Sequence, residues 1–162
     1  MIRWPRASAR CGVSWDQSSR LTPAMAEGCL FCGIVAGDVP AQIVDSDEHT
    51  IAFMDINPAT RGHSLVVPRT HSVDLLEISA EDLERTVLAA RRLAAKIRAS
   101  LDPDGINVLN SCGEAAWQTI FHFHLHVIPR YEGDPLKLPW IPRGAEAEEI
   151  AAVAEEIRGA NA

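Results

Sequence analysis

The chain has 162 residues, 47% hydrophobic and 23% charged, a composition typical of a globular protein with one core. Its formal net charge of −7 disfavours nonspecific binding to nucleic acid or to an anionic membrane, so neither is an expected partner. No apolar run approaches the roughly 18 residues of a membrane-spanning helix. The cysteines, two of them spaced as Cys29 and Cys32, do not form the pattern of a secreted disulfide framework, which favours a reducing cytoplasm.

Residues 1–24 differ from the rest of the chain. They contain four arginines against a single acidic residue, Asp16, and they show no hydrophobic periodicity. Such a composition can mark an organelle transit peptide. We favour a disordered tail or a start codon assigned too far upstream, with Met25 as the alternative first residue. Residues 25–162 are then expected to form a single domain that includes a C-terminal helix.

The chain after this segment predicts a mixture of strands and helices. A helical turn over 32–36 ends at Gly37, a residue common just after helix ends. Ser79 and Asp82 form a capping box, which predicts a helix running to about residue 99. Short β-branched and apolar runs bounded by turn residues predict strands at 42–44, 50–54, 64–67, 106–109 and 121–128.

Two segments carry apolar residues at helical spacing, which predicts that one face of each helix is buried. In the helix after Ser79, the side chains expected to face the core are Leu83, Val87, Ala90, Ala94 and Ile97. In a C-terminal helix over 146–158, they are Ile150, Val153 and Ile157. Together with the strands, these helices indicate an α+β fold.

Three of the chain's six histidines occupy alternate positions, at His122, His124 and His126. On a strand they would share one face, with successive side chains about 6–7 Å apart along the backbone. The apolar residues between them would face a core. A half-buried polar face, a metal site and covalent catalysis by imidazole each fit this pattern. As imidazolium, a second histidine would hydrogen-bond a phosphoryl oxygen or protonate a leaving group.

This stretch, His-Phe-His-Leu-His-Val-Ile, resembles the signature of the histidine triad (HIT) superfamily, His-φ-His-φ-His-φ-φ with φ hydrophobic. Further matches in the same order are C-L-F-C-G-I-V-A-G from residue 29, P-A-Q-I-V, I-A-F-M-D-I-N-P, R-G-H-S-L-V-V-P-R-T-H and W-Q-T-I-F. The similarity is to the Hint-like branch of nucleotide and nucleoside-phosphoramidate hydrolases. It implies a five-stranded antiparallel sheet with helices packed on one side. It also implies a homodimer, with helix 81–99 as the main candidate for its interface.

The resemblance implies hydrolysis at the α-phosphate of a purine nucleoside phosphoramidate or related nucleotide, releasing AMP. His124 resembles the nucleophile that carries the nucleotidyl group, and His126 resembles its partner on the phosphoryl oxygens and leaving group. A dinucleoside-polyphosphate hydrolase, a nucleotidyl transferase or phosphorylase, and a non-catalytic nucleotide-binding module are the alternatives. In the substrate site, the residues that match the family are Asp55 for the ribose, Phe31, Ile34, Phe53, Ile56 and Leu65 for the base, and Gln118 and Thr119 for the phosphate.

The chain also departs from the family pattern. Trp117 stands where a glycine commonly precedes the glutamine of the phosphate loop. The family's active-site asparagine falls on Asn110 or on Ser111, because the loop is one residue longer than in eukaryotic relatives.

The Cys29–Cys32 pair indicates either a buried pair of thiols or a metal site. Several bacterial members of the superfamily, and the related galactose-1-phosphate uridylyltransferases, carry a structural zinc. The resemblance therefore implies a zinc bound by Cys29, Cys32, His71 and His122. His63, the alternative fourth ligand, more closely matches a residue that supports the catalytic strand by hydrogen bonding. Zinc is not expected to take part in the chemistry.

Overall fold

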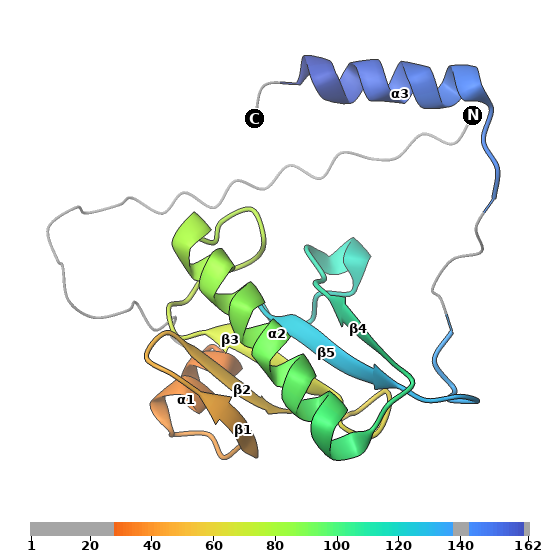
Figure 1. Ribbon diagram of the computed structural model, residues 1–162. Helices are drawn as coiled ribbons and strands as arrows, with labels where there is room; N and C mark the ends of the chain where they lie inside the picture. Colours follow the sequence, from red (N-terminus) through yellow and green to blue (C-terminus); the bar gives the residue numbers. More distant parts are fainter. Residues whose placement is uncertain (1–27, 138–142, 161–162) are drawn as a thin grey trace, which may run out of the picture.

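The computed structural model describes residues 28–137 and 143–160 (Figure 1). The elements in chain order are α1 (Leu30–Ala36), β1 (Ile43–Ser46), β2 (Thr50–Met54), β3 (Ser64–Pro68), α2 (Ala80–Leu101), β4 (Gly105–Leu109), the 3-10 turn η1 (Glu114–Ala116), β5 (Leu125–Arg130) and α3 (Ala147–Gly159). The strands form one antiparallel sheet in the order β1-β2-β3-β5-β4. The predicted α+β fold with a five-stranded antiparallel sheet is confirmed.

Each face of the sheet carries its own apolar cluster, because successive residues of a strand point to opposite sides. On one face, Ala52, Val66 and Val127 pack against α2, the helix that crosses the sheet in Figure 1. On the other face, Phe53 and Leu65 pack against α1. Thus α2 covers one side as expected, and the short helix α1 packs on the opposite side. The site described below lies on the α1 side.

Helix α2 begins where the capping box places it. The Ser79 side chain accepts a hydrogen bond from the Asp82 backbone N–H at 3.1 Å. The buried stripe runs through Thr86, Ala89, Ala90, Leu93 and Ile97. Leu83 and Ala94 pack at its margin. The prediction that Val87 faces the core is wrong: this side chain is 49% exposed, because the buried stripe passes through its neighbour Thr86.

The strand that carries the histidines begins later than predicted, at Leu125 instead of residue 121. Its neighbour β3 ends at Pro68, which has no N–H to continue a ladder of hydrogen bonds. The segment before β5 is held differently, because the Phe123 N–H donates to the Ser72 carbonyl at 2.6 Å. The predicted alternation of faces nevertheless holds, since Phe123, Leu125 and Val127 all belong to the core under α2.

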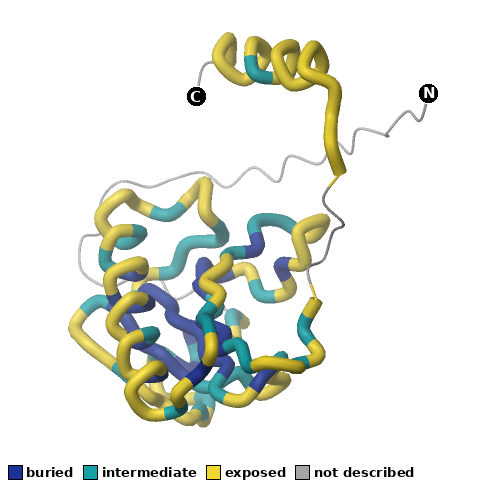
Figure 2. Tube along the Cα trace, turned by 45° about the vertical axis from the view of Figure 1, so that its right-hand side comes forward, coloured by how far each residue is buried: buried dark blue, intermediate teal, exposed yellow. Residues whose placement is uncertain are grey.

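The C-terminal helix α3 lies within one residue of its predicted bounds, but its apolar stripe is not buried. Ile150, Val153 and Ile157 are 58%, 49% and 70% exposed, so the prediction that they face inward is wrong for the part of the chain that the structure describes. Figure 2 shows α3 as exposed along nearly its whole length. The prediction for residues 1–24 concerns a segment outside the described residues. No helix in 28–137 or 143–160 has both the length and the apolar character to span a bilayer.

Candidate active site

A cavity of about 270 Å³ lies between α1, β2, β3 and the segment that leads into β5. Its lining includes all of the side chains expected to hold a base, namely Phe31, Ile34, Phe53, Ile56 and Leu65. Ile56 is 88% exposed and therefore stands at the rim. The expected ribose ligand Asp55 and the phosphate-loop residue Thr119 line the same cavity, together with His124 and His126.

The hydrogen bonds of His124 determine which of its ring nitrogens is free. Its Nδ1 lies 2.7 Å from the carbonyl oxygen of His122. A carbonyl only accepts, so Nδ1 must carry the hydrogen, and Nε2 of the neutral ring keeps its lone pair. Burial lowers the pKa of His124, which favours that neutral form, although the bond to the His122 carbonyl acts in the opposite direction. His124 therefore brings an unprotonated, nucleophilic nitrogen to the cavity.

His126 has the opposite tautomer. The Ala59 N–H donates to Nδ1 of His63 at 3.1 Å, so the hydrogen of a neutral His63 lies on Nε2. That Nε2 is 2.9 Å from Nδ1 of His126 and donates to it. Nε2 of a neutral His126 must then carry a hydrogen. The cavity thus has a lone pair on His124 and an N–H donor on His126.

The ring of His126 is neutral in the substrate-free site. Burial, together with the neighbouring His124 and His63, lowers its pKa to about 4 against the opposing effect of Asp55. The carboxylate of Asp55 is 3.6 Å from Nε2 of His63, and its charge acts to raise the pKa of both His63 and His126.

The first histidine of the triad faces away from this cavity and toward the cysteine pair. His122 Nε2 donates to the Pro68 carbonyl at 3.0 Å, which leaves Nδ1 unprotonated. That Nδ1 lies 3.6 Å from Sγ of both Cys29 and Cys32, and 3.4 Å from Nδ1 of His71. Nδ1 of His71 is also 3.4 Å from Sγ of Cys32. Four potential ligand atoms therefore converge.

These separations match the edges of a zinc tetrahedron. Bonds of about 2.3 Å to sulfur and about 2.05 Å to nitrogen give sulfur–nitrogen edges of about 3.6 Å and nitrogen–nitrogen edges of about 3.35 Å. The measured edges are 3.4–3.6 Å and 3.4 Å. Asp55, His63 and His126 also lie within mutual reach. There, however, the 2.9 Å separation of the two histidine nitrogens is that of a hydrogen bond. The donor set and its geometry fit zinc at the first cluster.

The remaining predicted residues act from behind the lining of the cavity. Asn110 Nδ2 donates to the His124 carbonyl at 2.9 Å, which holds the backbone of the expected nucleophile. Gln118 is buried; its Oε1 accepts from the Gly113 N–H at 2.7 Å, and its Nε2 donates to the Val73 carbonyl at 2.7 Å. The amide of Gln118 therefore shapes the phosphate loop in this structure, and Thr119 of the same loop lines the cavity.

Several groups that organise the site are backbone atoms, which the sequence does not reveal. They are the carbonyls of Pro68, Ser72 and His122 and the N–H of Ala59. The Pro68 and Ser72 carbonyls act on residues about 50 positions away in the chain. The His122 carbonyl and the Ala59 N–H act on residues two and four positions away. Only the histidine-rich signature and the R-G-H-S-L-V-V-P-R-T-H match pointed to this region.

A family model described as the HIT domain matches residues 36–133, which include the triad, α2 and all five strands of the sheet. The chain belongs to the HIT family. Protein hit of Bacillus subtilis is 45% identical to it over 116 residues, which are 71% of this chain and 80% of that protein. HIT membership supports a function of nucleotide-binding or hydrolase type.

Two solved HIT structures are similar to this one. A zinc-bound histidine triad family protein from Mycobacterium smegmatis is 40% identical, with a TM-score of 0.65 over 82% of this chain and 98% of its own. A histidine triad nucleotide-binding protein from Candida albicans is 26% identical, with a TM-score of 0.73 over 81% of this chain and 95% of its own. A zinc-bound relative makes the Cys/His cluster compatible with zinc in this HIT protein as well.

Proposed function

We propose that this HIT protein is a nucleotidyl hydrolase that cleaves purine nucleoside phosphoramidates at the α-phosphate and releases AMP. The observation that carries the proposal is the pair of opposite tautomers in one cavity. His124 brings a lone pair on Nε2, and His126 brings an N–H on Nε2. A nucleophile and a hydrogen-bond donor side by side are what a displacement at phosphorus needs.

In the first step, Nε2 of His124 attacks the α-phosphorus and the bond from phosphorus to the leaving amine breaks. The Nδ1 hydrogen bond to the His122 carbonyl stabilises the positive charge that develops on the attacking ring. An anionic phosphate beside His126 raises the pKa of that ring, because the anion favours its protonated form. Substrate binding thereby draws a proton from solvent onto Nδ1 of His126, which displaces the hydrogen bond from His63. The charged ring then gives its Nε2 proton to the departing amine.

In the second step, water attacks the same phosphorus and the bond from phosphorus to His124 breaks. Now neutral, His126 takes a proton from the attacking water, as the reversal of its first role requires. AMP leaves and the starting tautomers return. In the substrate-free site, His63 donates to Nδ1 of His126 and so orients that ring before the reaction starts.

The cavity has the chemistry to hold a nucleoside. Phe31 and Phe53 meet edge to face with ring centroids 5.3 Å apart, and with Leu65 they form an apolar slot for a purine ring. Asp55 Oδ1 accepts from the Asn57 N–H at 2.7 Å, and its remaining acceptor sites suit the two ribose hydroxyls. Thr119 provides a hydroxyl on the phosphate side.

We also propose that Cys29, Cys32, His71 and His122 bind one zinc ion, which supplies structural cross-linking between α1 and the segments that flank β3 and precede β5. A homodimer is proposed through α2 and the edge strand β4. Val87 and Leu88 on α2, and Val108 and Leu109 on β4, are large apolar side chains exposed in the single chain. A second copy would cover them.

The test is hydrolysis of a fluorogenic adenosine 5′-phosphoramidate by the wild type and by His124→Ala. We expect turnover that falls on the order of 10⁴-fold in the variant, while AMP binding, measured by calorimetry, survives. AMP binding without wild-type turnover would contradict the hydrolase and favour a binding module. Rates that depend on an added acceptor would favour a transferase, and turnover restricted to dinucleoside polyphosphates would favour that hydrolase class.

A further inference from the structure

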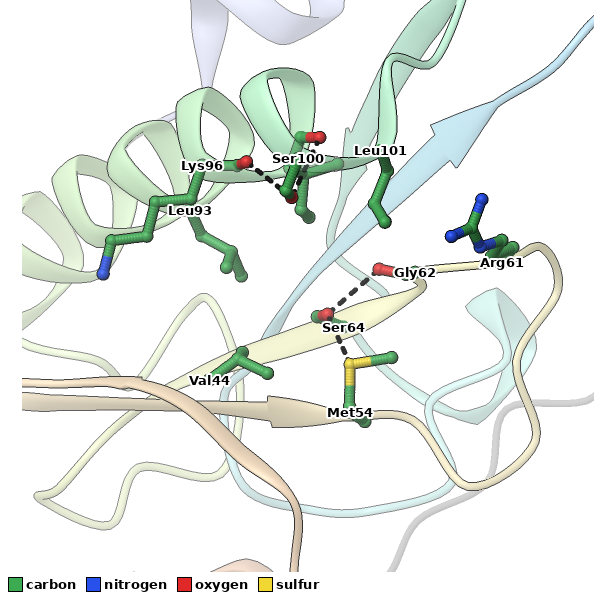
Figure 3. A pocket seen from close by; sticks show the side chains of 10 residues that line it. Val44, Met54, Arg61, Gly62, Ser64, Leu93, Lys96, Ser100 and Leu101 are labelled. Carbon is green, nitrogen blue, oxygen red and sulfur yellow. Dashed lines mark hydrogen bonds between the residues drawn. The ribbon is translucent and has the colours of Figure 1, made fainter.

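A second and larger cavity, of about 390 Å³, lies on the other side of the sheet (Figure 3). It opens between the C-terminal half of α2 and the strands β1 to β3. Leu93, Ile97 and Leu101 form its helix wall, and Val44 and Met54 form its strand wall. Its size falls within the roughly 300–1,000 Å³ that is typical of small-molecule sites. Nothing in the proposed hydrolysis uses this cavity.

The cavity is separate from the nucleotide pocket, although the two share one wall. Along β2, Phe53 faces the nucleotide pocket, and Met54 lines both cavities. Along β3, Leu65 lines the nucleotide pocket and Ser64 lines the second cavity. The two cavities are therefore back to back across a single layer of strands. A ligand in one need not compete with a ligand in the other.

The two cations at the mouth of the cavity differ in availability. Lys96 Nζ is paired with the Asp45 carboxylate at 2.8 Å. In Figure 3 its side chain extends away from Arg61. Across 28–137 and 143–160, the guanidinium of Arg61 has no ion pair or side-chain hydrogen bond with another residue. Arg61 is thus the cation that remains for a ligand.

The two serine hydroxyls that line the cavity already donate hydrogen bonds within the protein. Ser64 Oγ donates to the Gly62 carbonyl at 3.0 Å, and Ser100 Oγ donates to the Lys96 carbonyl at 2.8 Å. Their hydrogens are therefore already used. What remains is an apolar interior with one unpaired guanidinium at its edge, whose planar fork matches a carboxylate in two parallel hydrogen bonds. A phosphate dianion would need a second cation, and Lys96 is engaged.

We propose that this cavity is a second small-molecule site of the protein, for an aliphatic carboxylate whose chain lies between Ile97 and Met54 and whose head group pairs with Arg61. The apolar chain supplies most of the binding free energy through burial. The carboxylate sets the orientation of the ligand. The probe is octanoate, and octanol, which has the same chain length but no charge, is the control.

The test is a titration of methyl-labelled full-length protein with octanoate, followed by NMR. We expect saturable shifts of the Ile97, Leu101 and Met54 methyls, with those of Ile34 and Leu65 in the nucleotide pocket little changed. Arg61→Gln should weaken octanoate binding by up to about fivefold, the scale of one exposed ion pair. The matched control Arg98→Gln, an exposed arginine of α2 outside the lining, should leave the affinity unchanged.

Four results would overturn the proposal. These are the absence of saturable shifts, shifts centred on Ile34 and Leu65, equal affinity in the wild type and Arg61→Gln, or octanol binding as tightly as octanoate. A filled variant, Val44→Phe, provides a second check, because its ring would occupy the cavity from β1. It should abolish the shifts of the α2 methyls without changing those of the nucleotide pocket. Undiminished octanoate binding by that variant would also contradict the site.

Discussion

Nε2 of His63 lies 2.9 Å from Nδ1 of His126, and the Ala59 N–H holds the other nitrogen of His63. A backbone amide thereby fixes the tautomer of His126 through a second imidazole. Because the hydrogen of His126 must then lie on Nε2, the donor that faces the nucleotide is set before substrate arrives. His63 is a positioning residue for the proposed reaction.

Removing His63 should lower kcat more than it raises KM. His63→Ala releases His126 to change tautomer and leaves its Nδ1 without a donor. The loss of one such hydrogen bond, about 1.5–3 kcal/mol, corresponds to a decrease in kcat of roughly tenfold to a hundredfold. Steady-state kinetics with the phosphoramidate substrate measure it. His49→Ala, a change at a part-exposed histidine in the turn between β1 and β2, is the matched control and should leave kcat unchanged. An unchanged kcat in His63→Ala would contradict the positioning role.

Zinc loss should destabilise the protein before it affects the chemistry. Cys32→Ser removes one ligand of the proposed site, so the purified protein should contain far less than one zinc per chain by elemental analysis and should melt at a lower temperature. Cys112→Ser lies outside the cluster and should keep its zinc. A wild-type protein that is purified without zinc, takes up none when supplied, and melts at the same temperature would argue against the assignment.

The stability should fall as the pH decreases from about 6.5 toward about 4. Burial and the nearby imidazoles lower the pKa of His126 to about 4 in the folded state, against an ordinary value of 6.5. In that window the unfolded chain binds more protons than the folded chain, so the free energy of unfolding rises with pH and is lost on acidification. Urea denaturation at several pH values would show this slope. His126→Asn should flatten it, compared with wild type at equal zinc content, and an equally steep slope in the variant would refute the assignment.

Trp117 occupies a backbone conformation that suits glycine. Its φ is +68°, and its side chain is 67% exposed, so little packing offsets the strain. The left-handed conformation costs a non-glycine residue about 1–2 kcal/mol. Part of the gain from Trp117→Gly is offset by the greater freedom of glycine in the unfolded chain. We expect a small rise in melting temperature, measured by calorimetry. A clear fall would mean that the indole makes stabilising contacts.

Much of the fold was predictable because the patterns are local. The Ser79–Asp82 capping box placed the start of α2, and the alternation of histidine with apolar residues placed Leu125 and Val127 in the core. Every strand end except the beginning of β5 was predicted to within two residues. That beginning depended on Pro68 in a neighbouring strand, which is a long-range effect.

The sequence alone could not decide whether His63 or His71 lies beside the cysteines. Both lie in one short segment, but β3 runs between them and places them at opposite ends of a strand. Only His71 reaches the cysteines, and only His63 reaches His126. The predictions that Val87 and the apolar stripe of α3 are buried were wrong for a related reason. Periodicity shows that an apolar face exists, and it does not show what covers that face.

The most direct test of the central claim is to trap the nucleotidyl group on the enzyme. Wild-type protein would be mixed with the adenosine phosphoramidate, quenched during turnover under conditions that preserve phosphorus–nitrogen bonds, and examined by intact-mass and peptide mass spectrometry. We predict a single adenylyl adduct on His124. The adduct should accumulate to a higher level in His126→Asn, because that variant hydrolyses it more slowly. An adduct on His126 or His122, or full turnover through an enzyme that never carries an adduct, would contradict the mechanism.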